Sequence, residues 1–213
     1  AATNFPLFFS RNQQDGSWVL SALSSFEPMQ NLFVEEGHWN AIYQPISLQT
    51  FPFYLMQAPK VENSYTIGIL ENSEAFSTET GEAIFDSAGR ASLYLTKAKN
   101  LLEASIKQDI DTYRFTQEVE ALGLVKTIDL QLVFEDGNTQ NIAGLCTIDE
   151  DKLQSLPAEK MTALNDSGYL IAIHAMLLSI YQLNLLLRKH NERNTQNKIT
   201  QLKIEVAKDR VAS

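Results

Sequence analysis

The residue types best suited to chemistry gather around one glycine in the first quarter of the chain. Glu35, Glu36 and His38 flank Gly37, and Trp39 follows. Carboxylate and imidazole groups can hold a divalent metal or exchange protons with a substrate. Helical spacing would place Glu35 and His38 on one face, but the local pattern is that of a turn and no third ligand is evident. We therefore expect a solvated loop, with no metal and no cofactor, and keep Glu35 and His38 as candidate binding residues.

Aromatic side chains crowd the segment that follows this glycine: Trp39, Tyr43, Phe51, Phe53 and Tyr54. Aromatic rings offer a large contact area at a low cost in side-chain entropy, so such a segment can form a saccharide- or peptide-binding face. The same rings would equally serve as the core of an N-terminal sheet. We take the segment 39–54 as the candidate contact face.

Two isolated residues have a structural and a functional interpretation. His174 lies in an apolar segment, where a core histidine with one satisfied hydrogen bond is favoured over a ligand or proton shuttle. Cys146 is the only cysteine, which rules out an internal disulfide, and we expect a buried thiol. The sequence contains no glycine-rich phosphate loop, Ser-His-Asp signature or pair of metal-binding histidines, so no catalytic residue is predicted.

A long apolar segment organises the C-terminal half. Residues 169–187 contain no charged side chain, and Arg188, Lys189 and His190 follow at the end that suits cations. We predict one long helix that is buried on most sides. A membrane span and an oligomer interface are the alternatives for a segment of this length.

The other elements follow from periodicity and turn residues. Strands are expected at residues 5–9, 18–23, 31–34, 51–56 and 65–70, with a hairpin turn at Asp15-Gly16. Leu93, Leu102 and other apolar residues of segment 91–110 fall on one helical stripe, and Asp111-Thr112 is expected to cap a second helix that ends at Gly123.

The C-terminal third is predicted in the same way. Strands 127–134 and 141–148 flank the turn at Asp136-Gly137, and short helices are expected at 149–156 and 158–164. For segment 195–213 we favour an amphipathic helix over a strand.

These elements predict an α+β protein. Its N-terminal half is antiparallel and rich in aromatics, and its C-terminal half is helical with one β-hairpin and the long buried helix. We expect a single domain over 1–195, mainly β in 1–87 and mainly α in 88–195, and then a charged segment at 196–213.

Charge limits the classes of partner. The 213-residue chain has a net charge of -9, which disfavours nucleic acid and anionic lipid surfaces. We expect a protein, small-molecule or saccharide ligand, no membrane span, and leave self-association open. The start AATNFPLFFS lacks the basic region of a secretory signal, so a cytoplasmic location is expected. Because the chain begins at Ala1 rather than Met, a cell-surface or periplasmic location is the alternative.

Several short motifs taken together resemble the bacterial SapC-like family, in an order that covers roughly residues 5–190. The motifs are Phe26-Glu-Pro28, Asn31-Leu-Phe-Val34, Gly37-x-Trp39-x-Ala41-x-Tyr43-x-Pro45, Phe51-Pro-Phe53, Gly81-x-x-x-Phe85, Thr116, Leu122-Gly-Leu124, Asp136-Gly137, Ile142-x-Gly144-Leu145, Ile148-Asp149, Leu153-x-x-Leu156 and Gly168. The chain departs from the family at Gln49 and Thr50, where basic residues are usual.

The resemblance implies an association with a bacterial surface layer, from which the family takes its name, and brings no established catalytic residues. An unrelated peptide-uptake permease of the same name needs several spans and is set aside. We therefore favour a non-enzymatic binding or assembly protein of the bacterial cell envelope. The alternatives are an enzyme or accessory subunit in peptide or carbohydrate uptake or modification, using Glu35, His38 or His174, and a small-molecule-binding domain with its pocket against the long helix.

Overall fold

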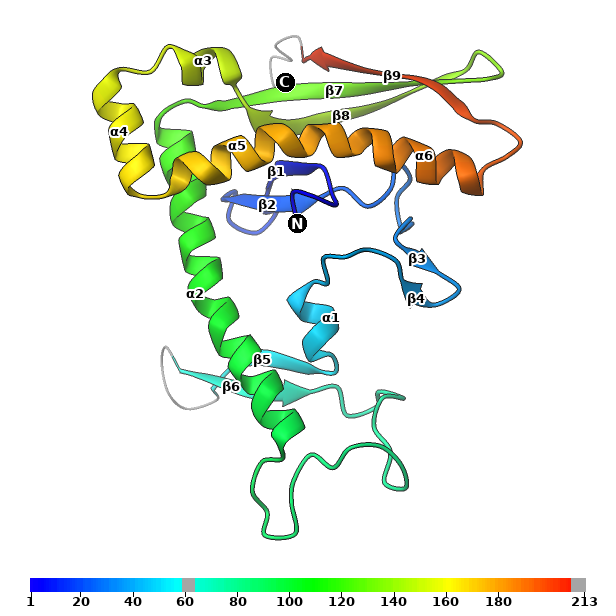
Figure 1. The fold of residues 1–213 in the computed structure, drawn as a ribbon, viewed down its shortest axis with the longest axis vertical. Coiled ribbons are helices and arrows are strands. Elements are labelled where there is room, and N and C mark those ends of the chain that lie inside the picture. Colours follow the sequence, from blue (N-terminus) through cyan, green and yellow to red (C-terminus); the bar gives the residue numbers. More distant parts are fainter. Residues whose placement is uncertain (59–63, 208–213) are drawn as a thin grey trace. The chain divides into compact units, whose positions relative to one another are not determined.

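The protein is α+β, as the sequence predicts, and its sheets are antiparallel (Figure 1). The computed structural model describes residues 1–58 and 64–207. The chain forms two compact units, one made of Ala1–Tyr43 with Thr112–Ser213 and the other of Gln44–Asp111. The domain boundaries expected at residues 195 and 196 remain a prediction.

A five-stranded sheet forms the framework of the first unit. Its strands are β1 (Leu7–Arg11), β2 (Trp18–Ala22), β7 (Val125–Phe134), β8 (Thr139–Ile148) and β9 (Ile199–Val206), in the order β2-β1-β8-β7-β9. Both predicted hairpins, β1–β2 and β7–β8, are confirmed.

Apolar residues at every second position of β7 form the buried face of this sheet. Ile128, Leu130 and Leu132 are fully buried, as their spacing predicts. Phe9 of β1 lies opposite Cys146 of β8, so the first strand of the chain pairs with one that is far away in sequence.

The long apolar segment is helical and lies across one face of this sheet (Figure 1). It comprises α5 (Tyr169–Ser179), the 3-10 turn η1 (Ile180–Gln182) and α6 (Leu183–Arg193). The backbone N–H of Leu7 donates to Ser179 Oγ at 3.0 Å, which fixes β1 beneath the helix.

Burial of this segment is confined to one side. Ile173, Met176, Leu183 and Leu186 are buried in the core. By length and composition the helix Tyr169–Arg193 would reach across a membrane, and 28% of its most apolar window is buried. The expectation of burial on most sides is therefore corrected: the inner face is core, and the opposite face is exposed.

Shorter elements surround this framework: α3 (Glu150–Gln154), α4 (Ala158–Asp166), β3 (Val34–Glu35) and β4 (His38–Trp39). The Asp149 carboxylate accepts a hydrogen bond from the Lys152 N–H and caps α3. Of the strand predicted at 31–34, only Val34 is in a strand, because Asn31 Oδ1 accepts from the Phe33 N–H and bends the chain.

The two helices predicted around Asp111-Thr112 are one continuous helix, α2 (Leu93–Ala121). Asp111 and Thr112 lie in its interior and cap nothing. The helix contains neither glycine nor proline, and the apolar stripe continues through the buried residues Phe115 and Val119, so no signal stops it there. It ends as expected before Gly123, which has a φ of 66°.

The helix predicted for 195–213 is wrong within the described residues, because 199–206 forms strand β9. This strand pairs with β7 from Phe134↔Ile199 to Ile128↔Val206. Leu202, Ile204 and Val206 alternate, and β7 offers a row of unpaired backbone groups, so pairing outweighs the weaker helical period. Residues 208–213 of this prediction lie outside the described part of the chain.

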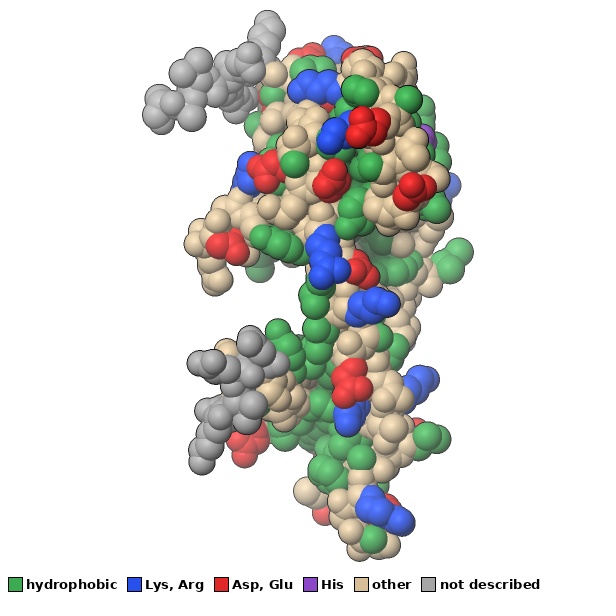
Figure 2. Space-filling view, turned by 90° about the vertical axis from the view of Figure 1, so that its left-hand side faces the viewer, with side chains coloured by type: hydrophobic (Ala, Val, Ile, Leu, Met, Phe, Trp, Pro, Cys, Tyr) green, Lys and Arg blue, Asp and Glu red, His purple; other side chains and the backbone are tan. Residues whose placement is uncertain are grey.

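The second unit has a small core. It contains α1 (Ile46–Thr50), the hairpin strands β5 (Phe53–Gln57) and β6 (Tyr65–Ile69), and α2 as far as Asp111. Among its described residues, the buried apolar side chains are Phe53, Ala98 and Leu102. Many hydrophobic side chains therefore remain at its surface, as Figure 2 shows in green.

Candidate functional site

The glycine predicted to lie in a turn is the tip of a tight hairpin. Glu35 of β3 pairs with His38 of β4, and Glu36 and Gly37 connect them with φ values of 49° and 80°. Two consecutive residues with positive φ are the mark of a type I′ turn, which matches the twist of the flanking strands. The hairpin, not helical spacing, places Glu35 opposite His38.

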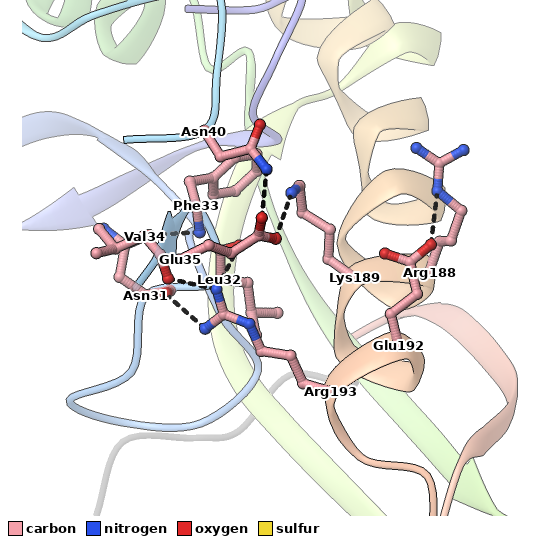
Figure 3. Close-up of polar contacts among 10 residues, drawn as sticks. All are labelled: Asn31, Leu32, Phe33, Val34, Glu35, Asn40, Arg188, Lys189, Glu192 and Arg193. Carbon is pink, nitrogen blue, oxygen red and sulfur yellow. Dashed lines mark hydrogen bonds and ion pairs between the residues drawn. The ribbon is translucent and has the colours of Figure 1, made fainter. Parts of the chain in front are cut away.

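Arg193 fastens this hairpin to α6. Its guanidinium donates to the carbonyl oxygens of Asn31 at 3.1 Å and Leu32 at 3.2 Å, and also to that of Val34. Figure 3 shows the side chain reaching from the last turn of the helix into the curve of residues 31–34. One cation thus donates to three backbone carbonyl groups of this curve.

A second link joins Glu35 to the helix and to the residue after the hairpin. Asn40 Nδ2 donates to Glu35 Oε2 at 2.6 Å, and Lys189 Nζ lies 3.5 Å from Glu35 Oε1. The Asn40 hydrogen bond, followed by the charges of Lys189 and Arg193, lowers the pKa of Glu35. The carboxylate is consequently ionised and already occupied on both oxygens.

Aromatic rings support the base of the hairpin. Trp39 lies 6.1 Å from Phe5 and 6.3 Å from Phe33 between ring centroids, and Lys189 Nζ lies 5.3 Å from the Phe33 centroid. The Trp39 indole N–H donates to the carbonyl oxygen of Tyr43 at 2.9 Å. Trp39 is therefore oriented by a hydrogen bond while part of its surface stays accessible.

Two open hollows adjoin at this point, and Glu35, Trp39 and Asn40 line both of them. The first, of about 790 Å³, extends over His38 and Arg193. The second, of about 610 Å³, extends along α6, where Leu185, Arg188 and Lys189 face Ala41 and Ile42. We call the two together the hairpin cleft.

Comparison with known proteins places the chain in a family. The model of the SapC family matches residues 1–186. The chain belongs to the SapC family. No curated protein and no solved structure matches it.

In this SapC protein, the residues predicted as one contact face fall in different units. Glu35, His38 and Trp39 line the hairpin cleft in the first unit. Tyr43 belongs to the same unit, and its carbonyl oxygen accepts the hydrogen bond from Trp39. The remaining three, Phe51, Phe53 and Tyr54, belong to the second unit. Within it, Phe53 is a core residue, whereas Phe51 and Tyr54 are exposed and lie 6.4 Å apart between centroids.

Of the two isolated residues, His174 and Cys146, only Cys146 is buried as the sequence predicts. His174 is exposed on α5, so the core interpretation is wrong, although its Nδ1 does lie 2.7 Å from the carbonyl oxygen of Leu170. It falls on the outward side because the helix buries the faces of Ile173 and Met176 instead. Cys146 is buried, as predicted, with its sulfur 3.5 Å from Thr127 Oγ1.

Sequence inspection overlooks three residues that build the cleft, namely Asn40, Lys189 and Arg193. The sequence identifies Lys189 only as a helix-end charge and assigns no role to Arg193, although their separation of four residues places them on one helical face. That spacing was an available signal, but the position of their partners, some 150 residues earlier, was not.

Most charged groups of the cleft are already paired with one another. Glu35 is held by Asn40 and Lys189, and Arg188 pairs with Glu192 at 3.7 Å. Among residues 1–58 and 64–207, no group of three or more His, Cys, Asp or Glu side chains is placed to hold a metal ion. The arrangement offers an aromatic surface bordered by amide, carboxylate and guanidinium groups of balanced charge.

Proposed function

We propose that this SapC protein is a non-enzymatic binding protein of the bacterial cell envelope, and that the hairpin cleft holds a saccharide. The observation that carries the proposal is the oriented, partly accessible Trp39 ring between Asn40 and the charged side chains of α6. An aromatic face packs against the C–H side of a sugar ring, while planar polar groups bind its hydroxyls.

The electrostatics of the cleft favour an uncharged ligand. Three acidic residues, Glu35, Glu36 and Glu192, are matched by Arg188, Lys189 and Arg193. Because the charges largely pair with one another, neither an anion nor a cation gains a strong advantage there. Hydroxyl groups can share these partners without breaking the pairs.

The envelope location is the part of the proposal that the family resemblance suggests, through its surface-layer association. A binding protein for envelope saccharides fits that setting. Immunoblotting of cytoplasmic, periplasmic, membrane and surface fractions of the source bacterium tests this part, and a protein confined to the cytoplasmic fraction would refute it.

Tryptophan fluorescence tests the binding proposal directly, since the chain has two tryptophans, Trp18 and Trp39. The indole N–H of Trp18 has no hydrogen-bond partner, so Trp18→Phe removes its signal without breaking a hydrogen bond. In this background, titration with solubilised peptidoglycan fragments and envelope oligosaccharides should change the emission of Trp39.

Variants then separate binding from other effects. Trp39→Ala should lower affinity at least tenfold by calorimetry, because the stacking surface is lost. His174→Ala, which lies outside the cleft, should retain it, whereas an enzyme that depends on this imidazole would lose its function. Equal affinity of wild type and Trp39→Ala for every saccharide that binds would refute the site.

A further inference from the structure

An exposed apolar strip runs along the outer side of α5, η1 and α6. Ile171, Leu178 and Tyr181 are 79%, 65% and 71% exposed. With the residues between and after them they follow alternating steps of three and four positions. We call this set the seam, and it consists of Ile171, His174, Leu178, Tyr181, Leu185 and Arg188.

Steps of three and four are the spacing by which one helix packs along another. The helix has already used a different face for its own core, the face of Ile173, Met176, Leu183 and Leu186. Within the seam only Leu185 also packs against the core, whereas Ile171, Leu178 and Tyr181 are exposed. Solvent exposure of large apolar side chains in a row marks a contact surface.

We propose that the seam pairs, antiparallel, with the seam of a second copy of this chain. No Asp, Glu, Lys or Arg occurs between Tyr169 and Leu187, although the chain as a whole has a net charge of -9. Two acidic copies repel each other over most of their surfaces, and this uncharged helix is where they approach at least cost. A two-fold axis makes one such patch serve both copies.

The ends of the seam determine the direction of pairing. The exposed residue Asp166 ends α4 just before the seam, and Arg188 closes the seam at the other end. An antiparallel arrangement brings Arg188 of one copy to the Asp166 end of the other, whereas a parallel one places Arg188 beside Arg188. Opposed helix dipoles favour the same choice.

In this register every seam residue has an apolar or complementary neighbour. Leu178 faces Tyr181 of the second copy, His174 faces its Leu185, and Ile171 packs on the aliphatic stem of its Arg188. A lipid surface is the less suitable occupant, because an interfacial helix that binds anionic lipid carries several cations along its edges, and this seam has one.

The seam also reaches the hairpin cleft, since Leu185 and Arg188 line the part that extends along α6. A second copy would bring its Ile171 end beside that part of the cleft. Self-association would thus narrow the entrance there, a consequence that does not depend on what the cleft binds.

Sedimentation equilibrium over a concentration series tests the association. The wild-type chain should dimerise, and Leu178→Glu should weaken dimerisation at least tenfold, because it places two carboxylates at the centre of the contact. Met29→Glu is the matched control, as Met29 is fully exposed outside the seam. Circular dichroism verifies that each variant is folded.

Cysteine cross-linking tests the direction. In a Cys146→Ala background, Ile171→Cys and Arg188→Cys chains are prepared separately and then mixed. Antiparallel pairing predicts a disulfide between the two kinds of chain and little within either kind. The two positions are too far apart along one helix to join within a single chain.

Three results would overturn the proposal. They are a wild-type chain that stays monomeric at every concentration, a dimer as stable in Leu178→Glu as in wild type, and cross-links formed mainly between identical chains. Binding of the monomer to phosphatidylglycerol vesicles, lost in Leu178→Glu, would likewise reassign the seam to lipid.

Discussion

Glu36 occupies a backbone conformation that its side chain disfavours. Its φ of 49° completes the turn with Gly37, and a β-carbon in this region crowds the following carbonyl oxygen. Asparagine tolerates the same conformation better, because its short side chain bonds to the local backbone. The hairpin therefore carries local strain next to the residues that line the cleft.

Replacing this residue should stabilise the protein. Glu36→Asn is expected to raise the free energy of unfolding by up to about 1 kcal/mol, since the turn becomes compatible with its residue. Urea denaturation provides the measurement, with Glu27→Asn, outside this turn, as the control. Destabilisation by Glu36→Asn would contradict the assigned turn.

His190 is the titratable residue most deeply placed near the site. It is buried, with ring centroids 5.9 Å from Phe26 and 6.4 Å from Phe134, and Asn194 Nδ2 lies 3.3 Å from its Nε2. Desolvation lowers the pKa of His190, and the nearby charge of Glu27 opposes this effect. The sequence predicts a cation at this helix end, whereas burial in the structure favours the neutral form of the His190 imidazole.

This shift predicts acid sensitivity. Below the ordinary histidine pKa of 6.5 the unfolded chain takes up a proton that the folded chain resists, so stability should fall as the pH drops from 7.5 to 5.5. In His190→Gln this part of the dependence should vanish, whatever its effect at pH 7.5. The exposed His38→Gln is the control, and an unchanged pH slope in His190→Gln would contradict the assignment.

At the scale of elements, the last turn of α6 holds the hairpin by side chains rather than by strand pairing. Arg193 makes three hydrogen bonds to backbone carbonyls of residues 31–34, whereas within the described part of the chain Arg188 has an exposed pair with Glu192. Arg193 thus has a structural role, whereas the side chain of Arg188 lies at the surface of the same helix.

Replacing each arginine should therefore change the stability of the protein by different amounts. Arg193→Met is expected to cost about 1–3 kcal/mol of stability, because carbonyl groups lose charged donors. Arg193→Lys should recover only part of it, since an ammonium lacks the planar fork, and Arg188→Met should cost less than about 1 kcal/mol. Urea denaturation measures all three. Equal decreases in the free energy of unfolding for Arg193→Met and Arg188→Met would refute the structural role of Arg193.

The elements that sequence reasoning predicts well are those with local signals. The Asp136-Gly137 hairpin, the Gly123 stop and the buried alternation of β7 depend on residues close together in the chain. Strand β9 was missed because its ambiguous pattern is decided by the free edge of β7, roughly 70 residues away. Glu35 and His38 remain candidate binding residues, chosen from their local spacing. The contacts that Lys189 and Arg193 make join them to positions more than 150 residues away, and no local pattern indicates them.

At the scale of the whole molecule, the two units differ in how much apolar surface they bury. The first has an extensive core beneath the five-stranded sheet, whereas the second buries Phe53, Ala98 and Leu102. Its hairpin β5–β6 also has no third strand among the described residues. Local stability follows the amount of buried contact.

Hydrogen exchange should therefore separate the units. Amides of β5 and β6 are expected to exchange at least tenfold faster than those of β7 and β8, each of which pairs on both sides. Mass spectrometry of peptic fragments measures this difference. Equal protection would show that the second unit is stabilised by contacts beyond its own core.

The first unit is assembled from both ends of the chain, and this has a consequence for its synthesis. Leu7 is anchored by Ser179, 172 residues later. A ribosome adding about 5–20 residues per second needs roughly 10–30 s to produce that anchor. During this interval β1 can pair with β2 but lacks β8 and the closing helix. The side chains of Phe8 and Phe9 therefore remain without the core that later buries them.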